Sequence, residues 1–242
     1  MTTGGSRVVE QKLGWGRFAL QVVTVLLAFV VASVIPVLAL GQDSVALALS
    51  ALASMVGGLA VAGCWLRRDG ALAAAFNLAS PASWPRTIGC GVAGALGIVA
   101  IFQVGGQLTQ ALGLAPPEVG TVMDLATQSP LHLLLWIVVV AWLSAALGEE
   151  LLWRGFLMDR LSRLPGLVGR TGPVLLIHAV FFSLTHAYQG LGGVIITGMA
   201  GLLLGWLRLR MGGNLWAAII AHGLVDTTML SLAYAEKLGW LG

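Results

Sequence analysis

The chain has 242 residues, of which 58% are hydrophobic and 10% charged, and its mean hydropathy is +0.92. Because about 25% of the residues of an ordinary soluble domain are charged, this composition excludes a soluble enzyme and a disordered chain, and two cysteines exclude a disulfide scaffold. The net charge of +3 does not indicate a nucleic-acid partner, since the basic residues are scattered between apolar runs. We therefore expect an all-α, polytopic transmembrane helix bundle that forms one integral membrane domain over residues 1–242.

Apolar runs along the chain predict about seven membrane-spanning helices. A helix needs about 20 mostly apolar residues to cross about 30 Å of hydrocarbon. The runs that approach this length are Phe18–Leu40, Val45–Leu66, Thr87–Leu112, Leu131–Leu164, Pro173–Tyr188, Leu191–Leu209 and Asn214–Ala233. Between the third and fourth runs, residues 113–130 contain prolines and acidic residues, and they are predicted to form a polar loop or a short surface helix.

The positions of lysine and arginine predict the orientation of these spans, because short cytoplasmic loops accumulate both residue types. With the N-terminus inside and the C-terminus outside, Lys237 is the basic residue that falls on the outer side. The basic residues placed on the inner side are Arg7, Lys12, Arg17, Arg67, Arg68, Arg86, Arg154, Arg160, Arg163, Arg170, Arg208 and Arg210. The excess of arginine over lysine, together with much alanine, glycine and leucine, is typical of a GC-rich bacterial genome. We expect a multi-pass protein of a bacterial inner membrane.

Ionisable side chains near the centres of the runs are confined to the second part of the chain. A charged side chain in the middle of a bilayer costs roughly 2.5–3.5 kcal/mol, so each one needs a partner or a function. The fourth, fifth and seventh runs contain such residues, whereas the centres of the first three do not. We therefore predict that residues 1–129 form scaffold helices and that residues 130–232 carry the activity.

Helical spacing separates the two adjacent glutamates of the fourth run. Glu150 and Arg154 are four residues apart with the acid first, which favours an ion pair on one helix face. Glu149 is turned about 100° away from Glu150 and has no cation of its own. A desolvated carboxylate without a counter-charge is suited to accept a proton. Glu149 is therefore the candidate proton acceptor, and Glu150 with Arg154 is a candidate structural pair.

Two further pairs lie at the same spacing on the fifth and seventh runs. Asp226 follows His222 by four residues, so it can hold the imidazole in one tautomer. Phe182 and His186 share a face, which gives the histidine an apolar wall. At about 1.5 Å per residue, Glu149, His186 and His222 lie roughly 12–20 Å from the inner ends of their helices. We expect them to converge on one buried cavity, where they could activate a water and stabilise an oxyanion.

Taken in order, these three motifs resemble those of the CAAX-protease and bacteriocin-processing intramembrane endopeptidases, also called the Abi family. The matching residues are Glu149, Glu150 and Arg154, then Phe182 and His186, and finally His222 and Asp226. The resemblance covers about residues 130–232, and each motif lies in its own apolar run. It implies hydrolysis of a peptide bond in a membrane-associated or membrane-inserted protein.

The resemblance also implies a role for each matching residue. On this pattern Glu149 is the general base and His186 is its partner in water activation. Glu150 and Arg154 form a structural clamp, and His222 and Asp226 are the oxyanion or orienting pair. Phe182 forms part of the pocket wall. Family members that process CAAX sequences carry Asn at the last position, where this chain has Asp226. An ionised aspartate can only accept hydrogen bonds, so His222 is expected to be the oxyanion donor. This departure favours bacterial members outside prenyl-protein processing.

Three other functions are open at this stage. A zinc-dependent hydrolase could use Glu149, His186 and His222 as ligands, although no short ligand motif supports it and we expect no cofactor. A haem or quinone protein could use His178, His186 and His222, but the nearby acids argue against it. A non-catalytic membrane scaffold or regulator would not need Glu149. The expected partners are a membrane protein or peptide substrate and the lipid bilayer, without nucleic acid, and the sequence does not specify the oligomeric state.

Overall fold

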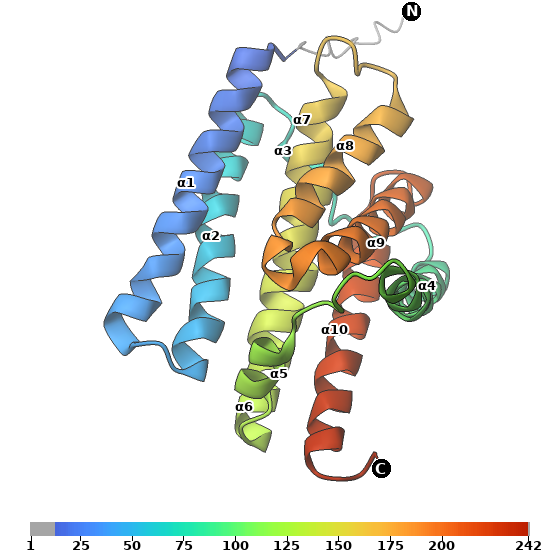
Figure 1. Ribbon diagram of the computed structural model, residues 1–242. Coiled ribbons are helices and arrows are strands. Elements are labelled where there is room, and N and C mark those ends of the chain that lie inside the picture. Colours follow the sequence, from blue (N-terminus) through green and yellow to red (C-terminus); the bar gives the residue numbers. More distant parts are fainter. Residues whose placement is uncertain (1–12, 242) are drawn as a thin grey trace, which may run out of the picture.

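The computed structural model describes residues 13–241, and over this range the protein is built of helices without any strand (Figure 1). The long helices are α1 (Trp15–Leu40), α2 (Ser44–Arg68), α4 (Trp84–Ala111), η1 (Trp136–Leu157), α9 (Gly190–Arg210) and α10 (Trp216–Lys237). The short ones are α3 (Leu72–Ala75), α5 (Gly120–Ala126), α6 (Pro130–Leu135), α7 (Met158–Ser162), α8 (Thr171–Leu184) and η2 (Ala187–Gln189). The predicted all-α bundle is confirmed.

Six helical stretches within the described residues are long and apolar enough to cross a membrane. They include α6, η1 and α7 as one continuous stretch, Pro130–Ser162, and η2 with α9 as another, Ala187–Arg210. The predicted run Pro173–Tyr188 is different, because its helix α8 has only 14 residues. At 1.5 Å per residue α8 is about 21 Å long, which is less than the hydrocarbon thickness. The protein is thus a multi-pass integral membrane protein, and residues 13–241 include six long apolar stretches and the shorter apolar helix α8.

Local sequence signals explain where several helices begin. Asp43 caps α2, since its side chain accepts a hydrogen bond from the backbone N–H of Ala46. Ser129 caps α6 in the same way, and Pro130 occupies the first helical turn, where its missing N–H is not needed. Residues 113–129 form a loop that contains the short helix α5, so the predicted break between the third and fourth runs is present.

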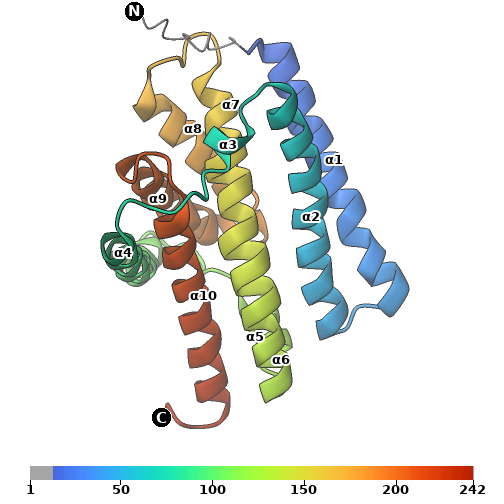
Figure 2. The same cartoon turned by 180° about the vertical axis from the view of Figure 1, so that it is seen from behind.

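The long helices do not all run in one direction. Helices α1, α2, η1 and α10 run along the vertical axis of Figures 1 and 2, whereas α4 is seen nearly end-on in both views and crosses them steeply. Glycines on α4 permit this crossing. A Cβ atom at Gly91 would lie 2.6 Å from Ile220 of α10, and one at Gly97 would lie 2.9 Å from Leu203 of α9. The sequence did not predict this change of direction.

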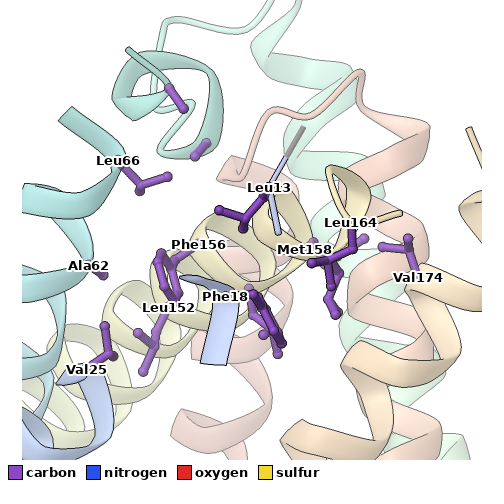
Figure 3. Packing of buried hydrophobic residues seen from close by; sticks show 14 of the residues in the cluster. Leu13, Phe18, Val25, Ala62, Leu66, Leu152, Phe156, Met158, Leu164 and Val174 are labelled. Atoms are coloured by element: carbon purple, nitrogen blue, oxygen red, sulfur yellow. The ribbon is translucent and has the colours of Figure 1, made fainter. Parts of the chain in front are cut away.

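An apolar cluster and a charge network join the start of α1 to the ends of α2 and α7. Figure 3 shows the apolar part, in which Leu13 and Phe18 pack in one cluster with Met158 and Leu164. Beside it, the fully buried Arg160 pairs with Asp159 and also with Asp69, which pairs with Arg17 as well. Arg7 and Lys12, which the orientation argument also used, lie outside the described residues. The start of α1 lies at one end of the bundle, and the end of α10 lies at the opposite end (Figure 1).

Candidate active site

A cavity of about 410 Å³ lies between η1, α4, α9 and α10, with residues of α8, η2 and the α5 segment completing its wall. The candidate site residues among those that line it are Glu149, Phe182, His186, His222 and Asp226. Most of the remaining wall is apolar, and no lysine or arginine of the described residues contributes to it. The structure therefore brings the three separate motifs together in one chamber.

Glu149 reaches this chamber from η1, which has π-type winding with backbone hydrogen bonds five residues apart. Its Oε2 atom is buried and has no hydrogen-bond partner among the described residues. The preceding Gly148 lets α2 pack closely behind it, since a Cβ there would lie 2.8 Å from Met55 Cγ. Glu149 thus lines the cavity and has one carboxylate oxygen without a hydrogen-bond partner among the described residues.

Glu150 points into the protein interior and bonds two groups with one oxygen. Its Oε1 atom accepts a hydrogen bond from Arg154 Nη1 at 2.9 Å and lies 2.9 Å from His222 Nδ1. Glu150 and Arg154 are both 0% exposed. The Arg154 guanidinium lies over the Phe182 ring, 4.1 Å from its centroid. The expected Glu150–Arg154 ion pair is present, and it also supports two residues of the cavity wall.

The hydrogen-bond partner of His222 corrects the sequence interpretation. Asp226 was expected to fix its tautomer, but the Asp226 Oδ2 to His222 Nε2 distance is 3.6 Å, which is too long for a hydrogen bond. Glu150, 72 positions earlier in the chain, holds Nδ1 instead. The i,i+4 spacing places Asp226 near the imidazole, but the packing of η1 against α10 places Glu150 closer.

His186 lies just beyond the C-terminal end of α8, where helix carbonyl groups lack intrahelical partners. Its Nδ1 atom is 3.0 Å from the Phe182 carbonyl oxygen and 3.3 Å from Thr185 Oγ1. Because a carbonyl oxygen only accepts, this contact assigns the proton to Nδ1 and leaves Nε2 as an acceptor. The rings of Phe182 and His186 are 4.8 Å apart, so the expected apolar wall is present.

One ligand set left open by the sequence, the three histidines of a haem or quinone site, is not assembled. His178 is fully buried and does not line the cavity, and its ring packs against Gly205 of α9 instead. The three-histidine set for haem or quinone is therefore not brought together. Within residues 13–241, no group of three His, Cys, Asp or Glu side chains is arranged to hold a metal ion.

Sequence reasoning missed two polar residues that line the cavity next to His186. Tyr188 stacks with His186, with the ring centroids 6.2 Å apart, and its hydroxyl accepts a hydrogen bond from Gln189 Nε2 at 3.1 Å. The available signal was Gly190, whose φ of 79° ends the turn after α8. A glycine after His186 indicated a chain reversal there, rather than a span that continues to Tyr188.

The comparison with protein families identifies the part of the chain that contains this site. Residues 131–228 match the Rce1-like family, described as type II CAAX prenyl endopeptidases. Over this region the chain is similar to the CAAX-protease family. The match includes all three motifs and confirms the resemblance seen in the sequence. It supports CAAX-type endopeptidase activity on a membrane-embedded substrate. No curated protein and no solved structure matched the chain.

Proposed function

We propose that this protein is an intramembrane endopeptidase of a bacterial inner membrane, in which Glu149 and His186 activate water. The observation that carries the proposal is that Glu149, whose Oε2 atom has no hydrogen-bond partner among the described residues, lines one cavity together with His186 and His222. A carboxylate without a hydrogen-bond donor is free to bind a water and to accept its proton. His186 Nε2 is the second acceptor available to that water.

The reaction uses these groups in sequence. Glu149 accepts a proton from the water as the water oxygen forms a bond to the carbonyl carbon of the substrate. The resulting tetrahedral intermediate carries a negatively charged oxygen. When the C–N bond breaks, the proton held by Glu149 passes to the leaving nitrogen, which gives a carboxylic acid and an amine. General acid–base catalysis of this kind contributes about 10²–10⁴-fold to rate.

His222 is the proposed donor to the negatively charged oxygen. Its Nδ1 atom is held by Glu150, and its Nε2 atom faces the side of Asp226. An imidazole between two carboxylates is stabilised in its doubly protonated form, whose Nε2–H can donate a hydrogen bond to an oxyanion. On this proposal Asp226 acts through His222, and Glu150 with Arg154 fixes the position of the ring.

The test compares Glu149→Gln and His186→Ala with the native protein in cleavage of a transmembrane reporter peptide. Both variants should lose activity by at least about 10²-fold while keeping the native elution profile and melting temperature in detergent. The matched control is Glu236→Gln, at the exposed end of α10, which should cleave normally. Near-normal turnover by Glu149→Gln would refute the general-base assignment.

The same variant separates an enzyme from a non-catalytic scaffold in cells. Peptide masses of membrane proteins are compared between cells that contain the native protein and cells that contain Glu149→Gln. An endopeptidase predicts that product fragments disappear in the variant cells while their precursors accumulate. A scaffold predicts identical peptide maps, because Glu149 would then have no chemical role.

A further inference from the structure

The charge of the cavity wall bears on which substrates the proposed protease accepts. Glu149 and Asp226 are the acidic residues of the wall, and His186 and His222 are its histidines. No lysine or arginine of residues 13–241 lines the chamber. The nearest cation on η1, Arg154, is 0% exposed and is already paired with Glu150. A substrate entering this chamber therefore meets two acidic side chains, and the basic group beside them is the His222 imidazole, whose Nε2–H is directed to the oxyanion in the proposed reaction.

Asp226 is the acid whose charge is available to a substrate. Its side chain is 32% exposed, and its closest ionic contact is the 3.6 Å approach to His222 Nε2. That distance leaves both carboxylate oxygens able to accept hydrogen bonds. Glu149 is committed to water in the proposed reaction, so Asp226 is the side chain that can bind a cationic group of the substrate.

The loop that completes part of the cavity wall, residues 113–129, is also acidic. Residues 113–129 contribute Pro117 and α5 side chains to the wall, and they contain Glu118 and Asp124, both exposed. The backbone N–H of Glu118 donates to the carbonyl of Gln189, which ties this acidic loop to the cavity. No lysine or arginine occurs between Arg86 and Arg154 in the sequence. Lys237, at the end of α10, donates a hydrogen bond from its Nζ atom to the carbonyl oxygen of Thr127 in this loop.

Acids in the cavity wall and in an adjoining loop attract cationic groups and repel anionic ones. Asp226 lies one helical turn beyond His222, toward the C-terminal end of α10, which is a displacement of about 6 Å. An extended peptide covers that distance in about two residues. From the proposed protease function, we infer that Asp226 is a specificity residue that selects substrates with a lysine or arginine about two residues from the scissile bond.

The test uses one transmembrane reporter peptide whose scissile bond has been located by mass spectrometry. Three versions differ at a single position, which carries lysine, methionine or glutamate two residues from that bond, and the series is made on both sides of it. The kcat/KM values are measured near neutral pH, where carboxyl groups are ionised and lysine is protonated. On one side of the bond, the native protein should prefer lysine over glutamate by about tenfold or more, as expected for partly desolvated charges in contact.

Variants of Asp226 separate selection from structural support. Asp226→Asn should reduce the ratio of lysine to glutamate cleavage to within about threefold, whereas Asp226→Glu should keep the lysine preference. A residue that only supports His222 would lower all three rates by one factor and leave the ratio unchanged. The matched control is Asp124→Asn, an exposed acid of α5, which should change the ratio much less and only at low salt.

The outcomes distinguish this inference from the function on which it rests. If the native protein cleaves all three peptides at one rate, or if Asp226→Asn keeps the native ratio, the selection by Asp226 is refuted while the protease function stands. If the native protein cleaves none of them, and no fragment depends on Glu149 in cells, the proposed function fails and the inference fails with it.

Discussion

His222 of α10 and Arg154 of η1 meet at the same oxygen atom of Glu150, with both nitrogen–oxygen distances at 2.9 Å. A carboxylate assigned by its spacing to a structural ion pair therefore also orients the candidate oxyanion donor. Its other oxygen is buried and has no hydrogen-bond partner among the described residues. The ion pair and the chemistry of the cavity are consequently coupled, and a change at Glu150 should affect both stability and activity.

Glu150→Gln should lower kcat by about 10–100-fold, the effect typical of losing a side chain that orients a site residue. The amide oxygen can still accept from one donor, but the negative charge that stabilises protonated His222 is lost. The measurement is cleavage of the reporter peptide together with the melting temperature in detergent. Unchanged kcat with a lowered melting temperature would mean that Glu150 has only a structural role.

Arg154→Ala should destabilise the protein by about 3–5 kcal/mol, because it leaves the charge of Glu150 buried without its main partner. It also removes the guanidinium that packs on Phe182. The matched control is Arg210→Ala, an exposed residue at the end of α9, which should stay within about 0.5 kcal/mol of native. The yield of folded protein and the thermal midpoint in detergent measure both, and equal values for the two variants would contradict the prediction.

Gly223→Ala should disturb the site through packing. A Cβ atom at Gly223 would lie 2.8 Å from the Trp142 ring, and Trp142 is itself fixed by its hydrogen bond to Thr227. Overpacking of this kind costs about 1–3 kcal/mol and should separate η1 from α10 beside His222. Gly106→Ala, with open space around its Cβ, is the matched control and should be neutral or slightly stabilising. Native melting temperature and activity in Gly223→Ala would argue against such tight packing.

The sequence predicted best what depends on neighbours along one helix. The Glu150–Arg154 pair and the contact between Phe182 and His186 both follow from a spacing of four residues, which puts side chains on one face. Membrane-spanning stretches could be read from apolar length, because the bilayer fixes how long a helix must be. These features need no knowledge of how one helix packs against another.

Features that depend on packing between helices could not be read in the same way. The hydrogen bond from His222 to Glu150 joins residues of different helices, and no periodicity within either helix indicates it. The steep crossing of α4 depends on which helix meets Gly91 and Gly97, and the glycines alone do not name that partner. The early end of α8 was missed because polar and apolar residues are mixed on both sides of His186, so hydropathy marks no sharp boundary there.

Reporter fusions should test the orientation of the bundle. With the N-terminus inside, a reporter after Gly41 or within residues 115–128 should be active on the outer side, and one after Asp69 or Gly166 on the inner side. The physical reason is the concentration of arginine at the predicted inner ends of the helices. The reverse pattern at either pair of sites would overturn the assignment. Each site is fused to two reporters, one active only outside and one active only inside, so that every fusion carries its own control.

Chelation should leave the activity intact. A zinc site polarises water with the charge of the ion, so removing the metal would abolish cleavage and adding zinc would restore it. A glutamate–histidine site needs only its own side chains. We favour it for two reasons: Arg154 places a positive charge about one turn from Glu149, and the sequence around His186 contains no short zinc-ligand motif. The assay is reporter cleavage after prolonged dialysis against a strong chelator, with the metal content of the same sample measured and a known zinc protease treated in parallel. Loss of cleavage in proportion to lost zinc, with recovery on adding zinc, would instead make Glu149, His186 and His222 the metal ligands.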